Sequence, residues 1–434
     1  MKKVAFHTLG CKVNTYDTEA MMELFENSGY QIVDFDDKAD VYVVNSCTVT
    51  NIGDKKSRQM IRKAKKQKDD SLVVVTGCYA QTAPEDLEQI PEVNLIVGTQ
   101  DRNRIVDLVE NITNHTQHFN VVKDIMSLKE YEELKISKVK DRIRAFIKIQ
   151  EGCDQFCSYC IIPYARGPIR SRKIENIIKE AKEVASKGYK EIVVTGINVS
   201  SYGKDIEDVS LIDVLNALNE IEGIQRIRLS SLEPMLLKQD FIEKLLNVDK
   251  LCDHFHLSLQ SGSDRILNLM NRRYTTKEYS GIIERIRKYY PTCSITTDVM
   301  VGFPEETEND FMDSLRYIER IGFSKLHVFK YSKRTGTPAA KNENQVPQWV
   351  KEERSKKLLA LSHRLEEQYS RQFILIKKEV LFEQHMKERD DFYLGHTKNY
   401  LLVGVESKEN IINQSKDVLL QGTLDNFLYG IIKQ

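Results

Sequence analysis

The stretch IRAFIKIQEGCDQFCSYC, residues 143–160, decides the fold because it joins an apolar strand to three closely spaced cysteines. Its opening run, IRAFIKIQ, is the first of six short apolar runs, which are separated by helical stretches such as ENIIKEAKEVASKG. Strand–helix alternation repeated in this way predicts a parallel sheet that curves into a full or partial barrel. The predicted strands are IRAFIKIQ, EIVVTG, RIRLSS, HFHLSL, SITTDVM and KLHVFK.

Unusual residues follow these strands at the point where each strand ends. Cys153, Cys157 and Cys160 follow the first strand, and the next four strands are followed by TGINVSSYG, SSLEP, QSGS and VGFPEET. In barrels of this type the chemistry lies at the carboxyl ends of the strands. We therefore expect the active site at this mouth of the barrel.

The N-terminal part of the chain, residues 1–100, repeats the alternation on a smaller scale. Apolar runs VAFHTLG, VYVVNSCTV, LVVVTGCYA and LIVGT alternate with helices predicted at 15–28, 54–68 and 84–89. Runs that are apolar on both faces predict a doubly wound parallel sheet. A cysteine follows each of the first three strands: Cys11, Cys47 and Cys78. Since the carboxyl ends of parallel strands meet at one edge, the fold would bring these distant cysteines together.

The remaining segments predict a linker, a helix and a third, all-β unit. Residues 101–140 are polar and weakly patterned, which predicts a linker at 121–140, and the charged amphipathic stretch 346–372 predicts a connecting helix. KEVLFEQ, YLLVGVES, DVLLQGTL and FLYGIIK then form short strands with no helix between them, which predicts a small antiparallel β-barrel. Such barrels often bind RNA, although a purely packing unit fits the same pattern. The predicted domains are 1–120, a linker at 121–140, 141–345, a connecting helix at 346–372, and 373–434.

Composition excludes several classes of protein. The chain has 434 residues, 41% hydrophobic and 29% charged, which is ordinary for a globular protein of about three domains. No apolar run approaches the roughly 18 residues that cross a bilayer, and the N-terminal apolar stretch is too short for a signal peptide. We therefore expect a cytoplasmic protein, whose eight cysteines are metal ligands, catalytic thiols or core residues. The 64 basic residues balance 64 acidic ones, so affinity for nucleic acid must come from local patches.

The triplet C-x3-C-x2-C lacks the fourth ligand of a closed zinc site. No histidine or cysteine lies near enough in the sequence to supply it, which disfavours zinc. Three thiolates can instead hold three irons of a [4Fe–4S] cube and leave the fourth iron open to an exogenous ligand.

With Tyr159 just before the third cysteine, this motif resembles the fingerprint of the radical S-adenosylmethionine superfamily. The resemblance implies that Cys153, Cys157 and Cys160 hold the catalytic cluster and that the methionyl end of S-adenosylmethionine chelates the open iron. An electron from the cluster would then yield a 5′-deoxyadenosyl radical. The implied cofactor-binding residues are Tyr159, Gly196, Asn198, Glu233 and Gln260.

The resemblance extends over nearly the whole chain. The cysteines in GCKVN, NSCTVT and GCYAQ, the stretch EGCDQFCSYCIIPYARGPIRSR and the C-terminal β-barrel together resemble the methylthiotransferases that modify tRNA, in which the small barrel is TRAM-like. In that family Cys11, Cys47 and Cys78 would hold a second [4Fe–4S] cluster that takes part in delivering sulfur. The implied reaction inserts sulfur and a methyl group at an unactivated C–H bond and uses two molecules of S-adenosylmethionine. The implied partners are tRNA, S-adenosylmethionine and an electron donor such as flavodoxin or ferredoxin.

A basic run provides a candidate surface for RNA. Residues 55–68, KKSRQMIRKAKKQK, hold eight Lys or Arg and no acid. Such a run can be no more than a solvated helix face, but here it follows the strand end that carries Cys47. We therefore predict phosphate contacts from Lys55, Lys56, Arg58, Arg62 and Lys63. The second candidates, which follow the cysteine triplet, are Arg166, Arg170 and Arg172.

Two stretches predict the nucleoside that is modified. GCKVNTYDTE and NSCTVTNIGDKKSRQ resemble the enzymes acting on N6-threonylcarbamoyladenosine at tRNA position 37 more than those acting on N6-isopentenyladenosine, which usually read GCQMN and NTC followed by an Ile-Arg pair. Both nucleosides take the group at carbon 2. The first carries a carboxylate, so its pocket needs a cation or several donors. The candidates are Arg272, Arg273, Lys333 and Arg334.

Alternatives stay open at this point. N6-isopentenyladenosine or a ribosomal protein could be the substrate, and the rival from another class is a two-cluster electron carrier or RNA-binding sensor. A pure carrier would need neither a barrel nor the strand-end motifs. Cys252 and Cys293 belong to neither cysteine set and are predicted to be structural. His254 and His256 alternate along a strand and are predicted to pack inside the barrel.

Overall fold

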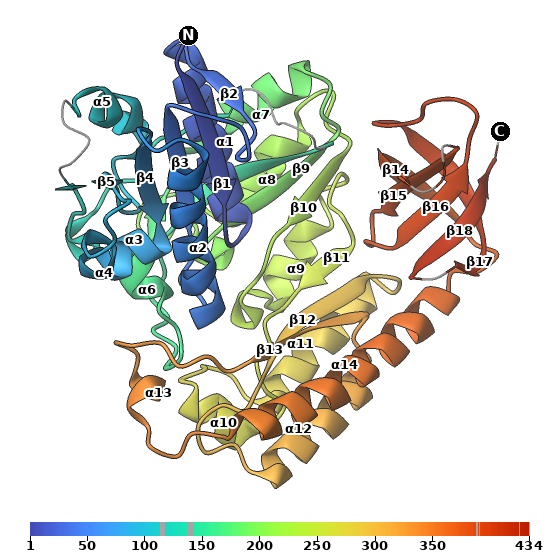
Figure 1. Cartoon of the computed structure of the whole chain (residues 1–434). Coiled ribbons are helices and arrows are strands. Elements are labelled where there is room, and N and C mark those ends of the chain that lie inside the picture. Colours follow the sequence, from blue (N-terminus) through green and yellow to red (C-terminus); the bar gives the residue numbers. More distant parts are fainter. Residues whose placement is uncertain (113–117, 137–142, 388, 390, 425, 434) are drawn as a thin grey trace.

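Six parallel strands form the N-terminal sheet, in the order β2–β1–β3–β4–β5–β6. Figure 1 shows it in a computed structural model, which describes residues 1–112, 118–136, 143–387, 389, 391–424 and 426–433. The strands are β1 (Lys3–Thr8), β2 (Gln31–Val33), β3 (Val41–Ser46), β4 (Leu72–Gly77), β5 (Leu95–Ile96) and β6 (Phe119–Asn120).

Helices cover both faces of this sheet. In β3, Val41 and Val43 pack toward one apolar layer while Tyr42 and Val44 pack toward the other. The first layer includes α1 (Lys12–Asn27) and α5 (Ile105–Glu110). The second includes α2 (Asn51–Gln67), α3 (Cys78–Thr82) and α4 (Pro84–Glu88). The predicted doubly wound sheet is confirmed.

The centre of the chain is an open barrel of six parallel strands. Two sheets, β10–β9–β7 and β11–β12–β13, are joined by isolated bridges between Ile227 and Leu251 and between Leu232 and Leu257. The strands are β7 (Arg144–Glu151), β9 (Glu191–Gly196), β10 (Arg226–Leu229), β11 (His254–His256), β12 (Ser294–Val301) and β13 (Lys325–Lys330), with β8 (Arg170–Ser171) antiparallel to the end of β7. Each of the six predicted strands is present, so the predicted partial barrel is confirmed.

Helices surround the barrel and give each strand an outer and an inner face. Ile147 and Phe255 belong to the apolar core beneath the helices. The helices are α6 (Ile162–Arg166), α7 (Ile174–Ser186), α8 (Leu211–Asn219), α9 (Gln239–Leu245), α10 (Asp264–Leu269), α11 (Thr276–Tyr289), α12 (Glu308–Ile321) and α13 (Pro338–Lys341). Short 3-10 turns lie at Arg102–Arg104 (η1), Ile125–Ser127 (η2), Val199–Ser201 (η3) and Pro234–Leu236 (η4). Because apolar side chains point outward on these strands, their alternate residues are free to be polar and face inward.

A long helix leads to the third unit. Helix α14 (Gln348–Arg371) runs along the central barrel to a separate small barrel, as Figure 1 shows. This small barrel is closed, in the order β14–β15–β16–β18–β17. Its strands are β14 (Lys377–His385), β15 (Phe392–Thr397), β16 (Leu402–Glu406), β17 (Ser415–Leu424) and β18 (Phe427–Ile432). The predicted small β-barrel is confirmed, and its strand pairs are antiparallel as predicted except β16 and β18, which pair in parallel.

The predicted linker, 121–140, contributes to packing where it is described. Leu134 and Ile136 are buried in the core of the central barrel together with Tyr16 from α1. Residues 137–140 lie outside the described residues. The two α/β units therefore share part of one core, although the exact domain boundaries stay predictions. Within the described ranges, no helix has the length and apolar character needed to span a membrane.

Candidate metal centres

The first cysteine set lies in the loop after β7. This loop is held by hydrogen bonds from the Cys153 N–H to the Gly167 carbonyl (3.0 Å) and from the Ser158 N–H to the Met270 carbonyl (3.0 Å). Phe156 adopts a positive φ of 44°, a conformation that costs free energy for a residue with a Cβ. Such strain persists because the surrounding hydrogen bonds fix the backbone of the loop. The same loop carries Cys153, Cys157 and Cys160.

The thiols of this set influence one another electrostatically. Burial, followed by the charge of Cys157, raises the pKa of Cys160 to about 12. Burial also raises the pKa of Cys153. Iron must therefore displace the protons of these thiols when it binds, since a metal ligates thiolates.

An arginine donates to the middle thiol of the triplet. Arg272 Nη1 lies 3.3 Å from Cys157 Sγ, and its Nη2 donates to Glu233 Oε1 at 2.6 Å. Arg272 Nε also donates to the hydroxyl of Tyr274 at 3.0 Å. Hydrogen bonds to the ligand sulfurs are one of the means by which proteins support iron–sulfur clusters, so this contact suits a cysteine that ligates iron.

A pocket of about 410 Å³ opens beside the triplet, in the size range of small-molecule sites. Asn198 and Glu233 line it together with Ser200, Lys204 and Arg273. The Asn198 side-chain amide lies 3.9 Å from Cys153 Sγ. The structure thus brings two of the predicted cofactor-binding residues to one pocket at the mouth of the barrel, where polar and apolar side chains meet.

The other predicted cofactor-binding residues lie around this pocket rather than on its wall. Gly196 ends β9 against Gln150, where an added Cβ would meet the Gln150 carbonyl at 3.1 Å. Gln260 has a positive φ of 70°, and its backbone bonds to Asp298 and Met300 of β12. Tyr159 packs edge-on against Phe303. Their contacts with a cofactor stay predictions.

The second cysteine set assembles at the carboxyl edge of the N-terminal sheet. Strand register pairs Thr8 with Asn45, and Ser46 with Gly77, so the chain leaves β1, β3 and β4 at neighbouring points. Cys11, Cys47 and Cys78 follow within a few residues. Burial raises the pKa of Cys47 to about 11, and the charges of Cys78 and Cys11 add to this shift.

Gly10 shows how closely two of these strand ends approach. Its φ is +113°, and an added Cβ would stand 2.9 Å from Asn14 Nδ2 and 3.3 Å from Cys47 Sγ. Glycine is required here both by the backbone conformation and by the lack of space. Cys11 follows at once and is the N-terminal cap of α1.

The arrangement of each set fits a cluster better than a single ion. Among the described residues no three His, Cys, Asp or Glu side chains converge closely enough to hold one metal ion. Thiolates of a [4Fe–4S] cube bind different iron corners, so their sulfurs need not converge on one point. The all-thiol donor sets, with an arginine donor beside each, are of the kind that iron–sulfur clusters use.

A buried ionic network joins the two sets. Arg166, from α6 in the loop of the first set, donates from Nε to Cys78 Sγ of the second set at 3.3 Å. Its Nη1 lies 3.0 Å from Asp17 Oδ2 and 3.0 Å from Glu151 Oε1. Glu151 lies two residues before Cys153. One side chain therefore connects the loop of the first triplet to a thiol of the second.

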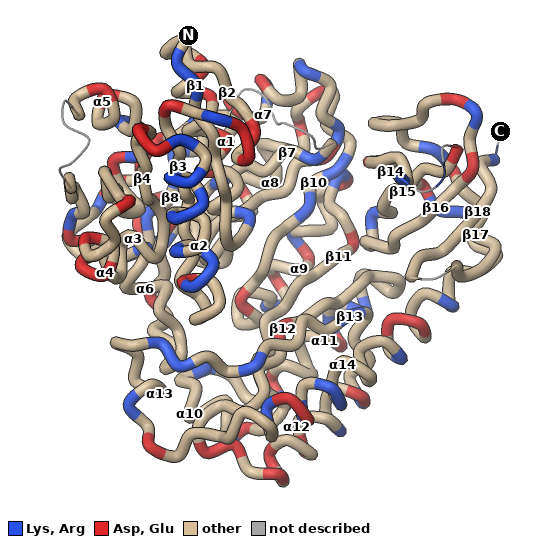
Figure 2. Tube along the Cα trace, in the orientation of Figure 1, with Lys and Arg blue, Asp and Glu red and all other residues tan. Residues whose placement is uncertain are grey.

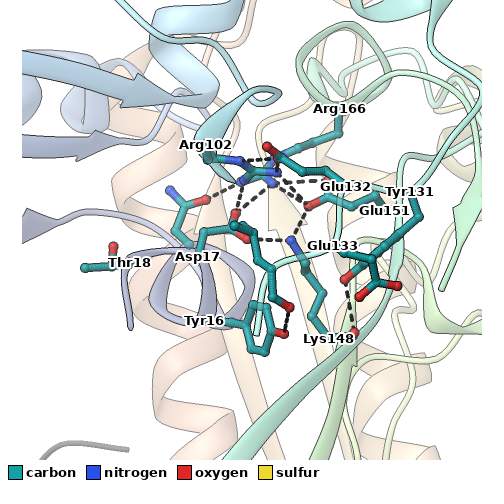
Figure 3. A network of polar contacts seen from close by, with 12 residues as sticks. Tyr16, Asp17, Thr18, Arg102, Tyr131, Glu132, Glu133, Lys148, Glu151 and Arg166 are labelled. Atoms are coloured by element: carbon teal, nitrogen blue, oxygen red, sulfur yellow. Dashed lines mark hydrogen bonds and ion pairs between the residues drawn. The ribbon is translucent and has the colours of Figure 1, made fainter. Parts of the chain in front are cut away.

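Further buried charges complete this network, as Figure 3 shows. Lys148 Nζ donates to Asp17 Oδ1 at 2.5 Å and to Glu151 Oε1 at 2.8 Å, and Arg102 pairs with Asp17 and Glu132. Burial by itself would raise the pKa of Glu151, but the charges of Arg166, Lys148 and Arg102 hold it well below its usual range. The carboxylates stay ionised, so the network is a set of mutually dependent buried charges.

Family models match two parts of the chain. The Radical SAM superfamily matches residues 147–318, and Uncharacterized protein family UPF0004 matches residues 3–98. A Bacillus subtilis protein named threonylcarbamoyladenosine tRNA methylthiotransferase MtaB is 46% identical over 417 residues, which cover 95% of this chain and 92% of that protein. The chain belongs to the radical S-adenosylmethionine methylthiotransferase family. Membership implies a [4Fe–4S] cluster and S-adenosylmethionine.

Other similar proteins carry two different names. An Aquifex aeolicus protein, also named threonylcarbamoyladenosine tRNA methylthiotransferase MtaB, is 42% identical over a region that covers 85% of this methylthiotransferase and 89% of that protein. An Acetivibrio thermocellus protein named tRNA-2-methylthio-N(6)-dimethylallyladenosine synthase is 36% identical over a region that covers 96% of this chain and 88% of that protein. Among solved structures, the radical S-adenosylmethionine methyltransferase TsrM from Kitasatospora setae superposes with a TM-score of 0.59 at 14% identity, covering 78% of this chain and 77% of that chain. That likeness shows the fold alone.

The structure corrects one prediction for the methylthiotransferase. Arg166, Arg170 and Arg172 were predicted to contact RNA, but each is at most 1% exposed. Arg166 belongs to the ionic network, Arg170 lies 4.0 Å from Glu151, and Arg172 pairs with Glu133 and Glu180. A buried guanidinium paired with carboxylates cannot reach a phosphate. The sequence did not reveal this because only the fold brings Asp17, Glu151 and Glu180 into contact with these arginines.

The predicted basic helix of the methylthiotransferase is largely accessible. Lys55, Lys56 and Arg62 are exposed on α2, and Figure 2 shows basic residues along this helix. Arg58 is instead held by the Tyr79 hydroxyl at 2.9 Å, and Lys63 pairs with Asp36. The accessible part of the predicted RNA surface is therefore smaller than the run of eight basic residues suggests.

Proposed function

We propose that this protein adds a methylthio group to carbon 2 of N6-threonylcarbamoyladenosine at position 37 of tRNA, using two [4Fe–4S] clusters and two molecules of S-adenosylmethionine. The observation that carries the proposal is the 46% identity to the Bacillus subtilis enzyme of that name over 95% of the chain. The two cysteine sets, joined through Arg166, support the use of two clusters.

Cys153, Cys157 and Cys160 would hold the cluster that binds S-adenosylmethionine, and Cys11, Cys47 and Cys78 would hold the second. When bound, the first cluster with S-adenosylmethionine supplies homolytic hydrogen abstraction, and the second supplies a site for sulfur. Arg272 and Arg166 each donate to a sulfur atom that would ligate iron, and hydrogen bonds to the sulfurs tune iron–sulfur clusters. The cysteine loop of the first set is fixed by its backbone hydrogen bonds, so its ligands are positioned in advance.

The pocket beside the triplet would bind S-adenosylmethionine. Asn198 offers an amide near Cys153, and Glu233 offers a carboxylate held by Arg272. An amide and a carboxylate suit the amino, carboxylate and ribose hydroxyl groups of this cofactor. Arg272 fixes the orientation of Glu233, because it donates to that carboxylate at 2.6 Å.

The proposal extends to partners and location. The C-terminal β-barrel and the exposed basic residues of α2 would contact the tRNA, and an electron donor such as flavodoxin or ferredoxin would reduce the first cluster. The protein would act in the cytoplasm, where tRNA and small reductants are available.

Competition between two tRNAs tests the proposal. Anaerobically reconstituted protein, with S-adenosylmethionine, a sulfur source and a reductant, would be given equal amounts of tRNA bearing either nucleoside. We expect the methylthio product to form on N6-threonylcarbamoyladenosine. Preferential product on N6-isopentenyladenosine would overturn the substrate, and the relatives with the dimethylallyladenosine name make this the second candidate. Nucleoside mass spectrometry of cells with and without the gene gives the matching test in vivo.

A further inference from the structure

Two of the cations predicted from the sequence to bind the substrate carboxylate are engaged by the protein itself. Arg272 donates to a carboxylate beside the first cysteine set. Arg334 is 8% exposed, and its Nη2 lies 2.7 Å from Asp54 Oδ2. Arg273 lines the pocket beside the triplet, and Lys333 is exposed, so these two stay candidates for the substrate. The role of Arg334 lies in its contacts within the protein.

Arg334 belongs to a strap, residues 332–339, that leaves the central barrel after β13. Figure 1 shows the chain passing here from β13 to α13. The N–H of Tyr331, just before the strap, donates to the Val301 carbonyl of β12 at 2.9 Å. The N–H and the hydroxyl of Thr337 both donate to the Arg334 carbonyl, at 3.1 and 2.7 Å. The strap is therefore fixed at its base and turns at Arg334.

Three side chains of the N-terminal unit bind the Arg334 guanidinium. Its Nη1 donates to Asn51 Oδ1 at 2.7 Å, and its Nη2 donates to Thr48 Oγ1 at 2.5 Å beside the ion pair with Asp54. The Asn51 N–H, in the first turn of α2, also donates to Ser332 Oγ at 3.2 Å. The strap of the central barrel is thus bound to the start of α2 in the other unit.

These contacts surround the backbone of Cys47, a predicted ligand of the second cluster. Thr48 follows Cys47 directly. Gly53, in the first turn of α2, lies so close that an added Cβ would stand 3.2 Å from the Cys47 carbonyl oxygen. Arg334 binds a residue on each side of this contact, Thr48 and Asp54. The position of the guanidinium therefore determines where the Cys47 loop lies relative to the strap.

The far end of the strap reaches the loop of the first cysteine set. The Ala339 N–H donates to the Ser158 carbonyl at 2.8 Å, and Ser158 lies between Cys157 and Cys160. The strap thus contacts the cysteine loop of each set. It is a second connection between them, separate from the one that Arg166 makes.

We propose, on the basis of the two-cluster function proposed above, that Arg334 is a positioning residue that holds the second cluster at a fixed distance from the first. A substrate that loses hydrogen at one centre and receives sulfur at the other must reach both within one complex. The spacing of the two centres therefore decides whether cleavage of S-adenosylmethionine leads to product. Arg334 sets this spacing because it ties the Cys47 loop to a strap that also holds the first loop.

The first readout compares two products made by the reconstituted protein with tRNA, 5′-deoxyadenosine and the methylthio nucleoside. Arg334→Gln should lower formation of the methylthio nucleoside by about 10- to 100-fold, the scale of a displacement of about 1 Å, and change 5′-deoxyadenosine formation by less than about 2-fold. Arg334→Lys should lie between this variant and wild type. Lysine keeps the charge but lacks the planar fork that reaches Thr48 and Asn51 together.

The second readout does not depend on turnover. With both clusters reduced and no tRNA present, electron paramagnetic resonance detects the interaction between their spins, which depends on the distance between the clusters. Arg334→Gln should alter this interaction while the protein still holds about eight irons per chain. A loss of global stability alone would not change the spin interaction at full iron content.

Two further variants make the result decisive. Thr335→Ala changes the exposed neighbour of Arg334 in the strap and should match wild type in both readouts. Asn51→Ala removes one partner of the guanidinium from an exposed position and should cause a smaller effect of the same kind, which keeps the test valid if Arg334→Gln does not fold.

Several outcomes would overturn the proposal. They are an Arg334→Gln protein with either readout as in wild type, an equal loss of both products, and a loss of iron from the second set. In the last two cases Arg334 would serve only to stabilise the fold. Wild-type protein that holds only about four irons, or that forms no methylthio nucleoside on either tRNA, would instead overturn the proposed function.

Discussion

The two cysteine sets provide similar ligands by different routes. Cys153, Cys157 and Cys160 lie in one loop, whereas the other set comes from three separate strand ends. Each set has one thiol that accepts a hydrogen bond from an arginine at 3.3 Å. Arg272 belongs to the same barrel as its thiol. Arg166 reaches Cys78 from the other unit.

This difference in origin has a consequence for assembly. The first set is complete within the central barrel, because its loop and its arginine donor both come from there. The second set needs the N-terminal sheet for its thiols and the central barrel for Arg166. We therefore expect the N-terminal centre to depend on contact between the two units, and the central centre to be less dependent on it.

The largest expected effect is on activity, and it distinguishes the reactions that the two cysteine sets support. Replacing Cys153, Cys157 and Cys160 with Ala should abolish both reductive cleavage of S-adenosylmethionine and the methylthio product. Replacing Cys11, Cys47 and Cys78 should abolish only the product, because the first cluster remains. After anaerobic reconstitution each triple variant should hold about four irons per chain, against about eight in wild type. Normal product from the N-terminal variant would contradict the role given to the second set.

The second largest effect is expected on stability, from the buried ionic network that joins the two α/β units. Glu151→Gln removes a buried carboxylate charge that pairs with Lys148 and Arg166, which leaves Asp17 as the acidic partner of both cations. We expect the free energy of unfolding to fall by about 3 to 5 kcal/mol in chemical denaturation. Glu130→Gln, an exposed residue, should change it by less than about 0.5 kcal/mol. Equal, small changes in both variants would show that the network contributes little to holding the two units together.

A smaller effect distinguishes the two arginine donors. Arg166→Lys and Arg272→Lys keep a positive charge but lose the hydrogen bond to sulfur. Each should lower the midpoint potential of its own cluster by on the order of 30 to 60 mV. For a one-electron couple, this shift is a change of about 3- to 10-fold in the equilibrium constant for reduction. The other cluster serves as the internal control in a redox titration followed by electron paramagnetic resonance. A shift of both clusters in one variant would mean that the network acts on the two sets as a unit.

The smallest effect concerns RNA and the exposed basic residues of α2, which belong to the N-terminal unit. Lys55→Gln and Lys56→Gln should each weaken tRNA binding by about 2- to 5-fold at low salt and reduce its salt dependence. Lys182→Gln, an exposed lysine on α7, provides the matched control. If all three variants bind tRNA equally well, α2 is a solvated face and the RNA surface lies elsewhere.

Local patterns in the sequence determined the fold to a large extent. The six barrel strands and the N-terminal sheet could be predicted because buried parallel strands are short apolar runs at regular spacing. The triplet after β7 could be read because its ligands lie within one loop. The dispersed cysteines required one further rule, that parallel strands end at one edge, and the register of β1, β3 and β4 follows that rule.

Only the tertiary structure decided how the charged residues are used. Arg166, Arg170 and Arg172 look in the sequence like an RNA-binding cluster, yet they are buried against Asp17 of α1, Glu151 of β7 and Glu180 of α7. The physical reason is that a charge takes its role from what surrounds it in space, and those neighbours come from parts of the chain that sequence patterns do not connect.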